Sequence, residues 1–228
     1  MADAPLREEE IESRWEAAPA VVLVIAFQIL LAVVSQRLGW KLWTFSWWVW
    51  LIPVVPELAL LGALAWDRPR RQLEQMGLRR EAALSLLGLI SLGNAFLLLA
   101  VIASLVRGDE KSGAQLLLKA VVVWGTNSIT YGLWFWALDR GGPVTRLQPD
   151  PPPPDFQFPQ MENPQLAEPR WRTHLVDYLY VSFTNSIAFS PTDAMPLTRR
   201  AKILMLSEAT VSAVTVLLVA ARAVNIFK

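Results

Sequence analysis

The sequence contains no cysteine and only one histidine among its 228 residues. Without cysteine, the chain can form no disulfide, no thiolate nucleophile and no thiolate metal site. The single histidine, His174, excludes the metal motifs that need a pair of histidines. The net charge of +1 and the lack of a basic helix with interleaved aromatic residues give no footprint for nucleic acid. We therefore expect no metal, no cofactor and no nucleic-acid partner.

Catalytic motifs are missing as well. The sequence holds no Gly-x-Ser-x-Gly, no His-Glu-x-x-His and no phosphate-binding loop. An enzyme within a membrane needs a base and a nucleophile or a pair of acids. Glu57 and Glu208 are the acids available, but no sequence pattern brings them together. We expect His174 to be an anchor at a membrane interface rather than a general base, so no catalytic residue is assigned and the protein is not expected to be an enzyme.

Apolar residues are abundant instead: they make up 54% of the chain, and charged residues only 18%. Several apolar runs of 20 or more residues are typical of a membrane protein. Residues 1–16 contain five glutamates where a secretory signal has basic residues, so the first apolar run is expected to remain as an anchor. The composition predicts a multi-pass protein of a bacterial-type inner membrane, with the lipid bilayer as its partner.

We predict an all-α membrane protein with five transmembrane helices, at about 17–36, 39–66, 82–106, 113–138 and 197–227. A further apolar segment, 175–189, is too short to cross a bilayer, which takes about 20 residues, and it ends at Ser190-Pro191. A half-crossing segment, a polar turn and then a full span form the outline of a re-entrant, pore-helix-like loop. Backbone of this kind at membrane depth is tolerated only where protein buries it or where it lines a cavity.

The chain is expected to have four parts: an N-terminal tail (1–16), a four-span bundle (17–139), a proline-rich linker (140–170), and the re-entrant loop with the final span (171–228). The linker carries prolines at 149, 151–154, 159, 164 and 169. Such a density of proline favours an extended, stiff chain. We interpret the linker as a surface connector without an apolar pattern that could form a core.

Charged residues inside the predicted spans are candidates for a site or a buried pair, because a charge at the bilayer centre costs about 2.5–3.5 kcal/mol on insertion scales. Glu57 follows Pro53 and Pro56, which interrupt the second span. It either marks a functional site, such as that of a small transporter, or pairs with a cation from another span.

Lys119 lies near the end of its span and is expected to extend its ammonium towards the interface. Thr-Asn-Ser-Ile occurs at 126–129 and again at 184–187, which is too short to indicate a repeat.

The C-terminal quarter carries a resemblance to a known family. The residues concerned stand at the spacing usual for that family, and they are Asp177, Tyr180, Ser182-Phe183, Asp193, Pro196-Leu197-Thr198, Glu208 and Ala221-Arg222. Residues 172–227 thereby resemble the pore module of small bacterial potassium channels of the two-span type: pore helix, filter, outer turn and inner helix. The resemblance implies a homo-oligomer, specifically a tetramer, and an ion path beside this loop. More loosely, the chain is similar to uncharacterised multi-span bacterial membrane proteins, which imply no activity.

The filter departs from that family. Where the family has Thr-Val-Gly-Tyr-Gly, this chain has Ala188-Phe189-Ser190-Pro191-Thr192. Both glycines are missing, and proline removes a backbone donor. A carbonyl-lined filter needs the backbone that glycine permits. We therefore expect a channel-like protein with a filter of another kind, not one of the potassium type.

The candidate path residues are neutral oxygens and amides that can replace a hydration shell, with acids beside them. Asp193 would attract cations at the rim, and Glu208 would lie on the last span behind the filter. The full set is Thr184, Asn185, Ser186, Ser190, Thr192, Asp193, Glu208 and, separately, Glu57. Polar residues aligned on a common lumen would favour an ion channel. A loop packed dry against the other spans would favour a non-conducting accessory or scaffold subunit.

The charge distribution and the channel resemblance predict opposite orientations of the protein in the membrane. The tail, the connection after the second span, the linker and the turn before the last span together hold 14 lysines and arginines, against six in the connections and terminus of the other side. The positive-inside rule places the richer side in the cytoplasm, whereas the channel resemblance demands the reverse. We follow the charge count, which has the loop open to the cytoplasm.

Asp177 is expected to be the N-cap of the short helix.

Overall fold

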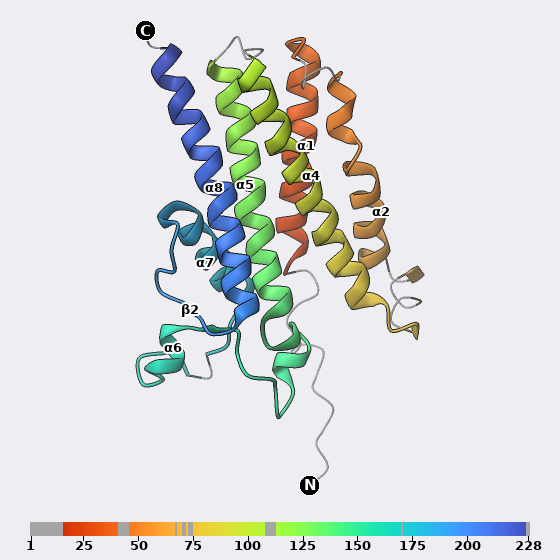
Figure 1. Ribbon diagram of the computed structural model, residues 1–228. Coiled ribbons are helices and arrows are strands. Elements are labelled where there is room, and N and C mark those ends of the chain that lie inside the picture. Colours follow the sequence, from red (N-terminus) through yellow and green to blue (C-terminus); the bar gives the residue numbers. More distant parts are fainter. Residues whose placement is uncertain are drawn as a thin grey trace.

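A computed structural model of the chain describes residues 16–40, 46–66, 68–69, 72, 75–107, 113–169 and 171–226, with side chains up to 221 (Figure 1). Within these ranges the protein is a helical bundle. The predictions for the N-terminal tail as far as residue 15 and for the matching Arg222 side chain lie outside the described residues.

Four of the five predicted spans correspond to a long helix within three residues at each end, whereas the second, predicted at 39–66, corresponds only in its later part. The helices are α1 (Ala18–Arg37), α2 (Val54–Ala65), α4 (Arg79–Arg107), α5 (Gly113–Leu138) and α8 (Arg199–Ile226), with the shorter α7 (Leu175–Ala188) before the last. A 3-10 helix, η1 (Trp47–Leu51), precedes α2. Pro53 is the N-cap of α2 and separates it from η1, whereas Pro56 lies in the first turn of α2, where proline is tolerated. The all-α class is confirmed.

Among the described residues, four helices are long and apolar enough to cross a membrane: 18–37, 47–65, 79–107 and 199–221. Helix α5, the fourth predicted span, is not among them although it has 26 residues. Its polar residues, which include Gln115, Lys119 and Asn127, lower its average hydropathy. The structure therefore supports a membrane protein with four apolar spans, and a fifth span at α5 stays a prediction.

Helix α5 lies at the centre of the bundle and packs against α1, α4, α7 and α8 (Figure 1). Its central place explains its composition, since protein rather than lipid surrounds it. Two glycines allow close approach: Gly125 faces the Phe27 ring, and Gly132 faces the backbone of Leu179 in α7. Lys119 is completely buried in this helix, so the expectation that it extends to the interface is wrong.

The proline-rich linker is not only a surface connector. Residues 149–154 are mostly exposed, as predicted. Phe156 and Phe158, however, are buried in an apolar cluster with Phe135, Tyr178 and Met205. Phe156–Gln157 forms strand β1, which pairs antiparallel with β2 (Met195–Pro196). The prediction of a linker without a core was wrong because the chain stays extended from β1 through Phe158, so that Phe156 and Phe158, two residues apart, point to the same side and share one cluster.

Helix α7 reaches only about half the height of the bundle (Figure 1). Tyr178, in its first turns, contacts Asp139 just beyond the end of α5, while Ser186 contacts Ser128 near the middle of α5. The chain then returns: the Leu197 N–H donates to the Asp155 carbonyl over 2.8 Å, and Arg200 donates to the Leu138 carbonyl over 2.9 Å. The helix and its return segment, 189–198, therefore begin and end at the same end of the bundle.

Candidate functional site

The buried carboxylate of Glu208 lies where α7 packs against α8. Its exposed fraction is 0%. The Asn185 amide donates to Glu208 Oε2 over 2.7 Å, and the Ser182 hydroxyl donates to Glu208 Oε1. Asn185 also donates to the Met205 carbonyl over 3.0 Å. Two neutral donors from one helix thus satisfy both oxygens of an acid on the next, which is what a buried carboxyl group needs.

Helix α5 completes this network. Asn127 donates to Ser212 Oγ over 3.0 Å and to the Glu208 carbonyl over 3.2 Å. The Ser128 hydroxyl donates to Ser186 Oγ over 3.0 Å, and the single Ser182 proton is shared between Glu208 Oε1 and the Ser128 carbonyl. The seven side chains are all at least 97% buried, and we call them the central polar cluster: Asn127, Ser128, Ser182, Asn185, Ser186, Glu208 and Ser212.

The two Thr-Asn-Ser-Ile segments meet in this cluster. Sequence reasoning treated their recurrence as coincidence. Because α5 and α7 run antiparallel, the Asn-Ser pair of each segment faces α8 or the other segment near the middle of the bundle. A signal was present: polar triplets in apolar helices face protein, because a polar group facing lipid has no partner. Two such triplets are therefore candidates for mutual contact even when they show no repeat.

The expected path residues divide into two groups. Asn185, Ser186 and Glu208 belong to the central polar cluster and pack against neighbouring helices of the same chain. Thr184 is half-buried, and Ser190, Thr192 and Asp193 are exposed on the outer side of α7 and its return segment. A single chain therefore does not place all the candidates on one surface.

The outward group forms a small polar strip. Thr192 donates to Thr184 Oγ1 over 2.9 Å, and the Tyr180 hydroxyl hydrogen-bonds to Asp193. The chain turns at Phe189, whose φ of +53° is a value that glycine usually supplies. The turn is thus made without the glycines of the potassium-type filter. We call Tyr180, Thr184, Ser190, Thr192 and Asp193 the outer polar strip.

Glu57 lies on the other side of α5, away from Glu208. It is fully buried in the first turn of α2, where the positive end of the helix dipole favours a carboxylate. The Gln28 amide of α1 donates to Glu57 Oε1 over 3.2 Å, and Gly93 of α4 lets α2 approach closely at this level. Glu57 hydrogen-bonds to α1 and Glu208 to α7, so the structure does not bring the two acids together.

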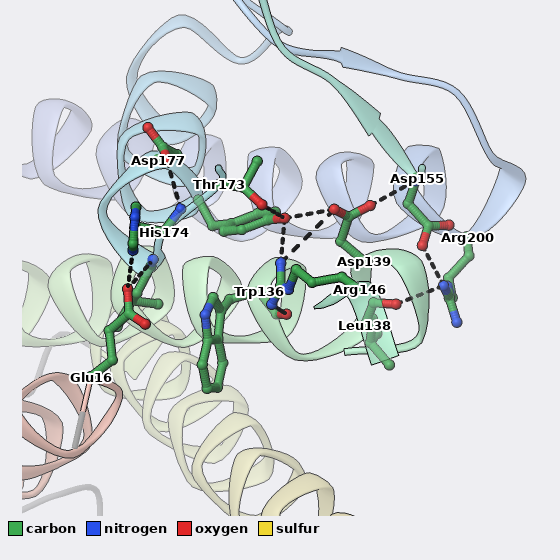
Figure 2. Close-up of polar contacts among 12 residues, drawn as sticks. Glu16, Trp136, Leu138, Asp139, Arg146, Asp155, Thr173, His174, Asp177 and Arg200 are labelled. Carbon is green, nitrogen blue, oxygen red and sulfur yellow. Dashed lines mark hydrogen bonds and ion pairs between the residues drawn. The ribbon is translucent and has the colours of Figure 1, made fainter. Parts of the chain in front are cut away.

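A second buried network, which sequence reasoning missed, joins α5, the linker and the start of α7 (Figure 2). Asp139 accepts a hydrogen bond from the Tyr178 hydroxyl over 2.6 Å and from the Asp155 N–H over 2.7 Å. Arg146 lies 4.0 Å from Asp139 and donates to the Tyr178 hydroxyl and the Trp136 carbonyl. In the sequence, Asp139 marked only the end of the predicted bundle, because no local pattern connects it to Tyr178, which lies 39 residues later in the chain.

Helix α7 begins with a capping box. His174 is the N-cap, and Asp177 at the third position accepts the His174 N–H over 2.7 Å. The prediction of Asp177 itself as N-cap was wrong by three residues, because the carboxylate reaches back to the cap instead of supplying it. Glu16 accepts the Leu175 N–H over 2.6 Å, and it lies 3.6 Å from the His174 ring (Figure 2). His174 thus anchors the start of α7 to the residues before α1.

No protein-family model, no curated protein and no solved structure matches this chain. The function must therefore be argued from its own residues. The resemblance of residues 172–227 to a channel pore module remains a hypothesis at this point.

Asn185 tests whether the central polar cluster is structural. Asn185→Ala removes two hydrogen bonds and leaves a buried Glu208 oxygen without its donor. We expect a loss of about 1–2 kcal/mol in the free energy of unfolding, because interhelical hydrogen bonds in membrane proteins contribute about 0.6–1.7 kcal/mol. Unfolding in mixed detergent micelles measures this, with the exposed Asn163→Ala as matched control. Equal stability of both variants would show that the cluster does not hold α7 in place.

Proposed function

We propose that this is a channel-like integral membrane protein whose copies assemble through α7, its return segment and α8, with an ion or small solute passing along the outer polar strip. The observation that carries the proposal is the position of this strip. It lies on the outside of a single chain, on a segment that turns at half the height of the bundle.

The outer polar strip needs something other than lipid to cover it. At membrane depth, irregular backbone and polar side chains are tolerated only where protein buries them or where they line a water-filled cavity. In a single chain, Ser190, Thr192 and Asp193 would face lipid. A second copy, or a path between copies, resolves the conflict. Neutral hydroxyls with one carboxylate suit a hydrated cation better than an anion.

The apolar surroundings of the strip fit such an assembly. Val176 and Ile187 on α7 and Ile203 and Leu206 on α8 are each about two-thirds exposed. A polar strip bordered by apolar helix faces is the pattern expected where subunits pack around a path. Four copies are implied only by the channel resemblance of residues 172–227.

In this proposal α5 is the fifth span and α7 with its return segment is the re-entrant loop. The richer set of lysines and arginines then lies in the cytoplasm under the positive-inside rule. The loop and the linker face that side, in a bacterial-type inner membrane. This orientation is opposite to that of the two-span potassium channels.

Ion flux from proteoliposomes tests the proposal. We would measure potassium, sodium and chloride flux under a set voltage with the purified protein, with Asp193→Ala and with Asp150→Ala. Both substitutions remove one exposed carboxylate, but only Asp193 lies on the outer polar strip. We expect cation flux that falls several-fold in Asp193→Ala and is unchanged in Asp150→Ala. Equal flux in all three proteins would place the path elsewhere.

A non-conducting accessory or scaffold subunit is the second candidate. The dry packing of Asn185, Ser186 and Glu208 favours it, because these three predicted path residues are at least 98% buried inside one chain. Absence of flux for every ion, in protein shown to be folded and oriented, would support this candidate. A small transporter that uses Glu57 would instead show uptake of a solute that Glu57→Gln abolishes.

A further inference from the structure

A cavity of about 450 Å³ opens among the linker and the start of α7, at the end of the bundle where α5 ends. Its lining includes Arg140, Arg146 and Arg172, together with Trp171, Gln160 and Thr173. Of the described residues that line it, none is acidic. Three guanidinium groups at one cavity, without a lining carboxylate, are an arrangement suited to an anion.

The three arginines are not equivalent. Arg146 is buried, and Asp139, which lies 4.0 Å away behind the wall, offsets its charge. Its guanidinium also stacks at 5.1 Å from the centre of the Tyr178 ring and 5.7 Å from that of the Trp136 ring (Figure 2). Arg146 is therefore a fixed part of the wall.

Arg140 and Arg172 supply the positive charge of the cavity that Asp139 does not offset. Arg172 is exposed, and Arg140 is half-buried. Among the described residues neither forms an ion pair. Arg140 has a φ of +51°, directly before Gly141 at +81°, so the backbone holds this side chain at the cavity in a conformation unusual for a residue other than glycine. Two uncompensated guanidinium groups match the charge of one phosphate group.

We propose that this cavity binds a phosphate group, and we call it the arginine pocket. Its volume lies within the range of small-ligand sites, about 300–1,000 Å³. The Trp171 ring gives it an aromatic wall beside the charges. The phosphate comes either from a free phosphorylated solute or from the headgroup of an anionic phospholipid, because basic pockets on the cytoplasmic side of membrane proteins bind such headgroups.

Binding in the arginine pocket would reach α7 directly. Because the Tyr178 hydroxyl proton goes to Asp139, the Thr173 hydroxyl, which lines the pocket, donates to the Tyr178 oxygen over 3.1 Å, and Arg146 donates to the same oxygen. The ligand would therefore contact groups that position the first turn of α7. Binding of the phosphate group does not depend on the channel proposal, since the pocket lies at the end of the bundle and apart from the outer polar strip.

The test uses the full-length purified protein in a neutral detergent and in lipid vesicles. Inorganic phosphate is titrated calorimetrically at constant ionic strength, with chloride as the reference anion. In parallel, the thermal unfolding midpoint is measured in phosphatidylcholine vesicles with and without phosphatidylglycerol. The variants are Arg140→Gln with Arg172→Gln, and the matched control is Arg199→Gln, an exposed arginine at the same end that does not line the pocket. Circular dichroism verifies that each variant is folded.

A free phosphorylated solute predicts that phosphate binds the natural protein and Arg199→Gln equally, and binds the double variant at least about tenfold more weakly. A lipid headgroup predicts no binding of inorganic phosphate, but an unfolding midpoint that phosphatidylglycerol raises in the natural protein and in Arg199→Gln and not in the double variant. Either result supports the arginine pocket. If neither assay separates the double variant from Arg199→Gln, the proposal is overturned.

Discussion

Asp139→Ala is expected to lower the free energy of unfolding by about 3–5 kcal/mol, a large part of the stability of most domains. Asp139 is fully buried, and its carboxylate accepts from Tyr178 and from the Asp155 backbone while it offsets the charge of Arg146. Its removal leaves a buried guanidinium without a counter-charge and two donors without acceptors. Denaturation in mixed detergent micelles measures the loss.

The location of the damage is part of the same prediction. Asp139 connects α5 to the linker and to α7, so hydrogen exchange should rise in the first turn of α7 and around β1 before it rises in α1 or α4 (Figure 2). Combining Asp139→Ala with Arg146→Met should recover part of the stability, because the unpaired charge is then gone. Asp150→Ala, which removes an exposed acid from the same linker, should leave stability unchanged. Equal stability of Asp139→Ala and Asp150→Ala would contradict the network.

Gly132→Leu is expected to undock α7 from α5 and to lower the free energy of unfolding by about 3 kcal/mol, the upper end of the usual cost of overpacking, which is about 1–3 kcal/mol. A Cβ at Gly132 would lie 2.8 Å from Leu179 Cδ2 and 3.0 Å from Leu179 Cα. The Leu179 side chain can rotate, but its backbone cannot move without shifting the whole of α7. The central polar cluster would then lose the hydrogen bonds that α7 supplies.

Gly88→Leu is the matched control for this prediction. Gly88 lies inside a long helix, as Gly132 does, but a Cβ there meets nothing within 4 Å. The same substitution should be neutral or slightly stabilising, because leucine favours a helix more than glycine does. Thermal unfolding and proteolysis between α7 and α8 compare the two variants. If Gly88→Leu and Gly132→Leu unfold alike, the close approach of α5 and α7 is not what holds α7.

The helices were the most predictable part of this protein. As helices, the segments 17–36 and 113–138 correspond to α1 (Ala18–Arg37) and α5 (Gly113–Leu138) within one residue at each end, whereas the segment 39–66 was expected to begin 15 residues before α2 does. Long apolar runs interrupted by glycine, proline and charge leave few choices for a helix boundary. The half-length helix after the linker was equally readable, because its apolar run is too short to cross and Pro191 follows it.

Partners between helices were far less predictable. Lys119 was expected at an interface and is buried, because α5 is enclosed by four other helices, a fact that its own sequence does not contain. Asn185 and Glu208 were expected beside an ion path, which stays a prediction, but their hydrogen bond to each other was not expected. Phe156 and Phe158 looked like part of a stiff connector, yet they complete an apolar cluster with residues of three helices.

The sequence by itself determined that this is an all-α protein with apolar helices suited to a membrane and a half-length helix before the last of them. Those properties depend on composition and on the length of apolar runs, which are local. Only the tertiary structure decided that α5 is the central helix, that Asn127 and Asn185 meet at Glu208, and that Asp139, Arg146 and Tyr178 form one network. The reason is physical: a buried polar group must find a partner, but which partner it finds depends on how the helices pack, and not on their spacing along the chain.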